Sequence, residues 1–364
     1  MTVAAEPRSK VQLAASHWKP RFVANGIDVN DFERVLGEAT EWHDWAPAWQ
    51  RVGDMHRALG DDAASRGRIV TATEAYQRAA WSYHLGKFLW FEDPSLHRRL
   101  SELTVSTYAK AIPHMDRPGR RIEVPFEGSV IPGILRLPRD AAHEGRGPRP
   151  ALVILVPGLD SVKEELFTME NVFLDRGMAT LSIDGPGQGE NAPRFPIRAD
   201  WATVITPLLD GLPRDAGVDL GRIGLMGISM GGIYGPRAAA KEKRLRALVA
   251  LAGPYDLSER FFALNPLTRG GLVFYTKSRD EAQAFERSKE LTLRGVLASV
   301  TCPLLVIHGA KDRLFPPEQA ERIAREAPNA TLLMYPEGNH VCNNITYEYR
   351  PAMADWLAER LATA

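Results

Sequence analysis

Cysteine is scarce in this sequence, and neither sign of charge is in excess. The 364 residues include two cysteines, Cys302 and Cys342, so one disulfide is arithmetically available but a disulfide framework is excluded. Lysine plus arginine and aspartate plus glutamate both number 45, so the formal net charge is zero. This balance gives no reason to expect nucleic acid or an anionic membrane as a partner.

Long apolar runs are missing as well. The longest, such as residues 151–157, have the length of a strand and are far too short to span a bilayer. Residues 1–12 contain no apolar segment of the kind that a signal peptide needs. We therefore expect a soluble, cytoplasmic protein.

Metal-binding and nucleotide-binding patterns do not occur either. There is no H-E-x-x-H motif, and His114, His308 and His340 are scattered along the chain. The run Asp184-Gly-Pro-Gly-Gln-Gly is rich in turn residues but is not G-x-G-x-x-G, so it predicts a turn and no nucleotide site. We expect neither a metal nor another cofactor.

The sequence changes character near Pro118. Before it, apolar residues recur at helical spacing, with several aromatic residues among them. Trp42, Trp45 and Trp49 recur near helical spacing, which is more typical of packing within a domain than of a ligand cage. We therefore expect a helical domain that ends close to Pro118.

Beyond Pro118, short β-branched runs alternate with helical patterns. Such alternation predicts an α/β fold, in which helices cover a mostly parallel sheet. Residues 254–300 lack a clean strand pattern and are too long for a simple connection, so we expect a helical excursion there. The predicted domains are an N-terminal helical cap over 1–117 and a catalytic domain over 118–364.

The strongest local signal is Gly227-Ile-Ser229-Met-Gly231, which has the form G-x-S-x-G. It follows the strand-like run from Arg222 to Met226 and precedes a predicted helix that begins at Gly232, which is the setting of a nucleophile elbow. At a helix N-terminus, a serine lies near N–H groups that stabilise negative charge. A tight turn with an ordinary serine is the alternative, but we predict Ser229 as the nucleophile of an α/β-hydrolase fold.

A serine nucleophile needs a base, and an acid must orient that base. Asp312 and His340 follow two later predicted strands, in the order Ser, Asp, His that α/β-hydrolases show. His308 is a rival base at the end of the strand that supplies the acid, and Glu337 is a rival acid almost adjacent to the histidine. We predict the triad Ser229, Asp312 and His340; a loop cap and a helix cap are the structural alternatives for the last two.

The loop after the first central strand is expected to complete the site. The oxyanion hole would use the N–H of Met230 and one N–H from this loop, for which Leu159 is the candidate. Asp160 follows, and Ser161 with Glu164 fits a capping box, so Asp160 has a structural explanation at a helix N-terminus. A carboxylate beside an oxyanion helps only if it is protonated or binds a substrate cation or hydroxyl. Asp160 is therefore a catalytic candidate with a structural alternative.

Five motifs occur in an order that resembles a known family. Together with the helical N-terminal part, they resemble the 2,6-dihydroxypseudooxynicotine hydrolase family of α/β-hydrolases. That family is similar to the fungal polyketide-shortening hydrolases of pigment synthesis and to the fermentation-respiration switch proteins. The motifs are Pro157-Gly-Leu-Asp-Ser-Val-Lys-Glu-Glu165, Asp184-Gly-Pro-Gly-Gln-Gly-Glu190, the serine elbow, His308-Gly-Ala-Lys-Asp312 and Gly338-Asn-His340.

The resemblance covers most of the chain and implies a reaction. That reaction is hydrolysis, through an acyl-enzyme, of a carbon–carbon bond between an acyl group and a hydroxylated (hetero)aromatic or polyketide-like ring. It also implies a catalytic carboxylate at Asp160, where the nicotine-degrading enzyme carries a glutamate. The shorter side chain departs from that pattern, so a pyridine substrate does not follow from the resemblance.

Two other functions compete with carbon–carbon cleavage. A carboxylesterase or amidase would use the same triad, because the acyl-transfer half of the reaction is identical. A non-catalytic partner-binding protein on a hydrolase fold is the alternative of a different class. The expected partner is a small acyl or aryl ketone substrate, and a homodimer stays open.

Overall fold

The computed structural model describes residues 9–139, 148–213 and 215–362. Its internal contacts divide the chain into two compact units, Met1–His114 and Met115–Ala364. Residues 1–8, which make up most of the segment judged for a signal peptide, lie outside the described residues. Among the described residues, no helix combines the length and the apolar character that crossing a membrane requires.

The first unit consists of helices around an aromatic centre. Trp45 and Trp49 are fully buried, and Trp42 stacks on Trp45 with ring centroids 5.7 Å apart. Trp18 and Phe32 add edge-on contacts to the same group. The tryptophans therefore pack within this unit, as their spacing predicted. The elements are α1 (Lys10–Ala24), α2 (Val29–Glu38), η1 (Trp42–Asp44), α3 (Trp45–Ser65), α4 (Ile69–Lys87), α5 (Pro94–Ala111) and η2 (Ile112–His114).

The second unit is built on an eight-stranded sheet with the order β1-β2-β4-β3-β5-β6-β7-β8. β2 pairs antiparallel with β1 and with β4, and the other neighbouring strands pair parallel. The strands are β1 (Gly119–Phe126), β2 (Ser129–Arg136), β3 (Ala151–Val156), β4 (Ala179–Ile183), β5 (Asp219–Ile228), β6 (Leu245–Leu251), β7 (Leu304–Gly309) and β8 (Ala330–Tyr335).

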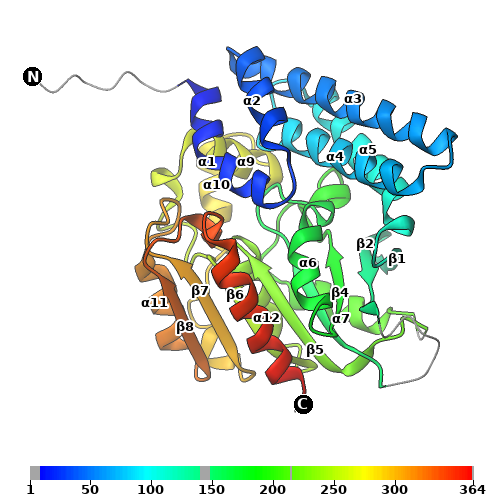
Figure 1. Ribbon diagram of the computed structural model, residues 1–364. Helices are drawn as coiled ribbons and strands as arrows, with labels where there is room; N and C mark the ends of the chain where they lie inside the picture. The colour runs from blue at the N-terminus through cyan, green and yellow to red at the C-terminus, as the bar shows by residue number, and fades with distance from the viewer. Residues whose placement is uncertain (1–8, 140–147, 214, 363–364) are drawn as a thin grey trace, which may run out of the picture. The chain divides into compact units, whose positions relative to one another are not determined.

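Helices cover both faces of this sheet (Figure 1). The helices described in the unit are α6 (Phe167–Leu174), α7 (Ala202–Asp210), α8 (Gly231–Ala239), α9 (Pro266–Tyr275), α10 (Glu281–Ser288), α11 (Pro317–Glu326) and α12 (Thr346–Ala362). α6 and α12 share one core with the side chains of Met226 and Val249. Gly235 of α8 lies against Leu225 and Leu248, which alternate along the strands with the first pair and so belong to the opposite face.

The topology gathers the loops that carry the candidate residues. β3 and β5 are neighbours at the centre of the sheet and run parallel, with Val156 opposite Gly227 at their C-terminal ends. The loops after β7 and β8 leave the sheet at the same edge, where ligands bind in open α/β sheets. Between β6 and β7 the chain forms α9 and α10, and an isolated antiparallel bridge pairs Asp256, which precedes α9, with Thr292, which follows α10.

Candidate active site

Ser229 lies at the tight turn between β5 and α8. Its φ of 55° falls in the left-handed region, which a residue other than glycine enters only where its surroundings hold it. Its N–H donates to the carbonyl oxygen of Leu251 at 2.7 Å. A Cβ on Gly227 would lie 1.9 Å from the carbonyl oxygen of Gly231, and a Cβ on Gly231 would lie 2.4 Å from that of Val156. The G-x-S-x-G spacing therefore forms a nucleophile elbow.

Hydrogen bonds join Ser229, His340 and Asp312. The Ser229 hydroxyl oxygen lies 3.0 Å from Nε2 of His340, and Nδ1 of His340 lies 2.7 Å from Oδ2 of Asp312. A ring whose Nδ1–H donates to a carboxylate presents Nε2 as an acceptor for the serine proton. The structure thus brings together the three residues that the sequence singled out, from three separate loops.

Asp312 is both buried and anchored. Its Oδ1 accepts the backbone N–H groups of Leu314 at 2.8 Å and Phe315 at 3.1 Å. Burial acts to raise the pKa of this carboxyl, but the charge and the hydrogen bond of His340 outweigh it and hold the pKa of Asp312 below its ordinary value. The carboxylate is therefore ionised at neutral pH and fixes the orientation of the His340 ring.

The rival base and the rival acid have other partners. The Nε2–H of His308 donates to the carbonyl oxygen of Phe315 at 2.8 Å, in a fully buried setting. Burial lowers the pKa of His308, so the ring is neutral at pH 7. Glu337 is 72% exposed and pairs with Lys311. Of the two histidines, the one that bonds Ser229 is His340.

The loop after β3 runs directly beside the nucleophile. A Cβ on Gly158 would lie 3.0 Å from Cβ of Ser229 and 3.5 Å from its hydroxyl oxygen. Met230 follows Ser229 and is buried at the start of α8. Within the described part of the chain, no acceptor takes a hydrogen bond from the backbone N–H of Leu159 or of Met230. Two such N–H groups near a nucleophile are what binding an oxyanion requires.

Asp160 is buried in the same loop, and the capping box expected next to it does not form. Its carboxylate accepts a hydrogen bond from the Tyr275 hydroxyl, and its φ is 53°. The predicted capping box is wrong: Ser161 donates to Glu165 at 2.6 Å instead, and η4 (Lys163–Leu166) begins without a side-chain cap. The Glu165 carboxylate, buried inside η4, accepts the Ser161 hydroxyl, so this side chain does not cap the helix.

Tyr275 is the residue near this site that sequence reasoning missed. It ends α9, inside the helical excursion, and no motif surrounds it. Burial raises the pKa of Tyr275 well above its ordinary value, and the charge of Asp160 adds to the effect. The phenol therefore keeps its proton at neutral pH and acts as the donor to Asp160.

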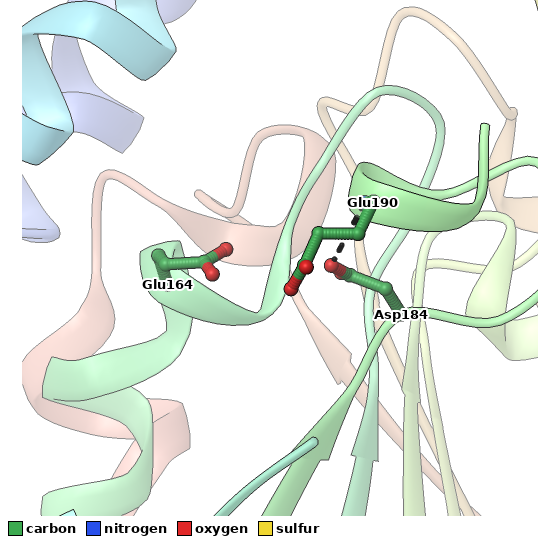
Figure 2. Close-up of side chains that lie close together, drawn as sticks. All are labelled: Glu164, Asp184 and Glu190. Carbon is green, nitrogen blue, oxygen red and sulfur yellow. Dashed lines mark hydrogen bonds between the residues drawn. The ribbon is translucent and has the colours of Figure 1, made fainter. Parts of the chain in front are cut away.

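Three carboxylates face one another beside the same loop (Figure 2). Oxygens of Glu164, Asp184 and Glu190 lie within 4.8 Å of one another, a spacing that could hold a metal ion. The Lys163 ammonium, however, lies 2.7 Å from the first two and 2.6 Å from the third. Burial acts to lower the pKa of Lys163, but these carboxylates outweigh it and hold the pKa above its ordinary value. The Lys163 cation therefore lies between the three carboxylates, Glu190 also pairs with Arg121 at 2.7 Å, and burial raises the pKa of Glu164.

The sheet order, the elbow and the hydrogen-bonded Ser, His and Asp define an α/β-hydrolase, and the comparisons agree. Residues 28–259 match the model of the family described as Esterase FrsA-like, and residues 166–363 match the Prolyl oligopeptidase family. The chain belongs to the esterase FrsA-like family of hydrolases. The expected fold class and the expectation of an enzyme are thereby confirmed.

Two relatives show how far the similarity extends. The chain is 31% identical to 2,6-dihydropseudooxynicotine hydrolase of Paenarthrobacter nicotinovorans, over 99% of this chain and 95% of the relative. The solved structure of a 2,6-dihydroxy-pseudo-oxynicotine hydrolase superposes with a TM-score of 0.85 at 30% identity, covering 95% of this chain and 96% of that one. The resemblance inferred from the five motifs is confirmed.

Fungal hydrolases are similar over a shorter stretch. Hydrolase acrC of Aspergillus aculeatus is 36% identical over 64% of this chain. The matched stretch amounts to 59% of the fungal protein's own length. This similarity therefore concerns a part of each chain.

Proposed function

We propose that this protein hydrolyses a carbon–carbon bond between an acyl group and a hydroxylated (hetero)aromatic or polyketide-like ring, through an acyl-enzyme. The observation that carries the proposal is the hydrogen-bonded chain from Asp312 through His340 to Ser229. Similarity to 2,6-dihydropseudooxynicotine hydrolase over 99% of this chain supports the substrate class. Because that similarity spans both units, we propose the helical unit as a cap domain that contributes to specificity.

The first half of the reaction forms the acyl-enzyme. His340 Nε2 takes the proton of Ser229 as the serine oxygen attacks the ketone carbonyl carbon. Asp312 stabilises the imidazolium that results, and the N–H groups of Met230 and Leu159 bind the oxyanion. When the intermediate collapses, the bond to the ring breaks and its electron pair stays with the ring carbon.

That ring carbon must receive a proton, and His340 carries the one taken from the serine. Water then attacks the acyl-enzyme with His340 again as base, which releases a carboxylic acid and restores Ser229. In this scheme Asp160 acts on the leaving ring. A carboxylate that accepts a hydrogen bond from a ring hydroxyl makes the ring carbon more basic, so this carbon takes the proton from His340 as the bond breaks and the ring departs as its keto tautomer.

Ester or amide hydrolysis is the second candidate, and one observation favours it. The matched families are described as Esterase FrsA-like and Prolyl oligopeptidase, and the acyl-transfer chemistry of the triad is common to all three reactions. An alkoxide or phenoxide departs with little help, whereas a carbon leaving group must receive a proton as the bond breaks. A role for Asp160 in leaving-group departure therefore separates carbon–carbon cleavage from the alternatives.

The test uses one variant and two substrates. Asp160→Asn keeps the size of the side chain and suits its left-handed backbone, because asparagine enters that region readily. We expect the variant to lose most of its kcat/KM on an acylated dihydroxyaromatic ketone and to keep it on an activated phenyl ester. The ratio of the two kcat/KM values, measured on one preparation, does not depend on the fraction of the protein that is folded, because that fraction enters both values equally.

Asp256→Asn is the matched control, since Asp256 is also buried but bonds Ser258 in the segment after β6. Its ratio should equal that of the wild type. Equal loss on both substrates in Asp160→Asn would assign Asp160 to the general architecture of the site. Loss on neither would contradict its role at the leaving ring. A wild-type protein that a fluorophosphonate fails to label would contradict the serine mechanism and favour a non-catalytic binding protein.

A further inference from the structure

Gln188 lies buried in the turn that follows β4, and its amide has a partner at each end. Nε2 donates to the carbonyl oxygen of Pro157 at 2.6 Å, and Oε1 accepts the N–H of Gly185 at 2.9 Å. The side chain is 1% exposed, so water does not compete for these bonds. The glutamine therefore ties the start of the loop after β3 to the turn after β4.

The same turn also holds the far end of that loop. The backbone N–H of Lys163 donates to Oδ1 of Asp184 at 3.0 Å, and its ammonium contacts Oδ2 at 2.7 Å. Glu190, at the other end of the turn, contacts the same ammonium at 2.6 Å. The loop from Pro157 to Lys163 is thus fixed at both ends by residues of one turn.

The turn is itself a rigid support. Its Gln188 N–H donates to the carbonyl oxygen of Gly185 at 3.0 Å, and the Asp184 N–H donates to that of Pro132 in β2 at 3.0 Å. Gly189 has a φ of 40°, and a Cβ there would lie 2.1 Å from the Asp184 carboxylate. The glycine-rich sequence is therefore needed so that the carboxylate can lie inside the turn and face the loop.

Between the two fixed ends lie Gly158, Leu159 and Asp160. Gly158 has no side chain to hold it, because a Cβ there would press against Ser229. The Leu159 N–H has no acceptor within the described part of the chain. A peptide next to glycine rotates readily. The direction in which the Leu159 N–H points therefore depends on the hydrogen bonds that hold the residues on either side of it. The nearest anchor on the N-terminal side is the bond from Gln188 to Pro157.

We propose that Gln188 is a positioning residue that aims the Leu159 N–H at the oxyanion of the reaction. The inference rests on the proposed function, since the oxyanion forms when Ser229 attacks a carbonyl. Loss of the bond to Pro157 frees the peptide that precedes Gly158, and the Leu159 N–H then samples other directions. Because the oxyanion exists only in the transition state and intermediate, the effect falls on kcat and leaves KM unchanged.

The test is Gln188→Glu, which keeps the side-chain length and the acceptor for Gly185 but removes the donor to Pro157. We expect kcat to fall about 10- to 100-fold, part of the about 10²- to 10³-fold that losing an oxyanion donor costs. KM should stay within about threefold. An aryl trifluoromethyl ketone forms a tetrahedral adduct with a serine, so its Ki should rise by the same factor as kcat falls.

Gln319→Glu is the matched control, because Gln319 is also buried, and its amide accepts backbone N–H groups at one end and donates to the Glu259 carboxylate at the other. Its Oε1 accepts the N–H of Tyr255 at 2.8 Å, in the segment after β6. That variant should keep wild-type kcat and Ki even if its melting temperature falls. Gln188→Met, which removes the donor without adding charge, gives a second test with the same expected outcome if the glutamate variant does not fold.

The outcomes separate two failures. If the ketone inhibits the wild type, and kcat and Ki of a folded Gln188→Glu stay within about threefold of wild type, the positioning role is overturned. A fall in kcat with an unchanged Ki, or an equal fall in Gln319→Glu, also overturns it. A wild type that turns over substrate but is not inhibited by the ketone contradicts the proposed function, and the inference falls with it.

Discussion

Replacing Gly158 with alanine tests whether the loop after β3 must lie against the nucleophile. The new Cβ would lie 3.0 Å from the carbonyl oxygen of Ile228 and 3.0 Å from Cβ of Ser229. Non-bonded carbon atoms normally sit about 3.5–4.0 Å apart, so the loop or the serine must move by about 0.5 Å or more. Neither neighbour is the flexible end of a side chain, so the shift falls on backbone.

Two effects of different size follow from that shift. Overpacking of this kind costs about 1–3 kcal/mol of the free energy of unfolding, which should lower the melting temperature without preventing folding. A misplacement of about 1 Å in a catalytic group costs about 10²-fold in rate, so half of it predicts a loss of about tenfold in kcat. KM should change little, since the misplaced N–H acts on the oxyanion and not on the ground-state substrate.

The assay is steady-state kinetics on an acylated dihydroxyaromatic ketone together with thermal unfolding. Gly37→Ala is the control: it lies in α2, and a Cβ there meets nothing within 4 Å. That change should be neutral or stabilise the helix by up to about 1 kcal/mol, with kcat unchanged. A stable Gly158→Ala variant with wild-type kcat would refute the close approach of the loop to Ser229.

Two further predictions concern buried polar groups. Burial lowers the pKa of His308, so below about pH 6.5 the folded protein binds fewer protons at this residue than the unfolded chain does. The free energy of unfolding therefore falls as the pH falls below about 6.5, by at most about 1.4 kcal/mol per pH unit from this residue. Denaturant titration at pH 7.0 and 5.5 should therefore show a smaller loss for His308→Gln than for the wild type, and an equal loss would contradict the neutral ring. Tyr275→Phe removes a donor from the buried Asp160, so it should cost about 1–3 kcal/mol of stability and depress ketone cleavage more than phenyl ester hydrolysis; unchanged stability would show that the pair contributes nothing.

The parts of the structure that were predictable from sequence depend on local patterns. The apolar run of β3 and the glycines around Ser229 each specify their own conformation within a few residues. Parallel strands then place Asp312 and His340 at the same edge of the sheet as the serine, because the C-terminal ends of such strands coincide. The mostly parallel sheet and the order of the triad residues along the chain could therefore be inferred together.

The remaining features depend on contacts between residues far apart in sequence. Tyr275 meets Asp160 across more than one hundred positions, and the segment that carries it has no motif. Lys163 and Asp184 belong to two motifs that sequence reasoning quoted separately, and only the pairing of β3 with β4 brings them together. The capping box at Ser161 failed for a different and local reason: the buried Glu165, four residues along the chain, accepts the Ser161 hydroxyl, and the sequence pattern did not reveal this competition.

The measurement that bears most directly on the central claim is the turnover of Ser229→Ala on an acylated dihydroxyaromatic ketone, with product mass analysis. Removing a triad nucleophile elsewhere lowers kcat by many orders of magnitude, so we expect a loss of at least about 10³-fold here. The fold should be retained, because the side chain that is lost is small and its backbone contacts remain. Wild-type Ser229 protein should yield the carboxylic acid and the free hydroxylated ring. A Ser229→Ala variant that still cleaves the ketone at near wild-type rate would contradict the account.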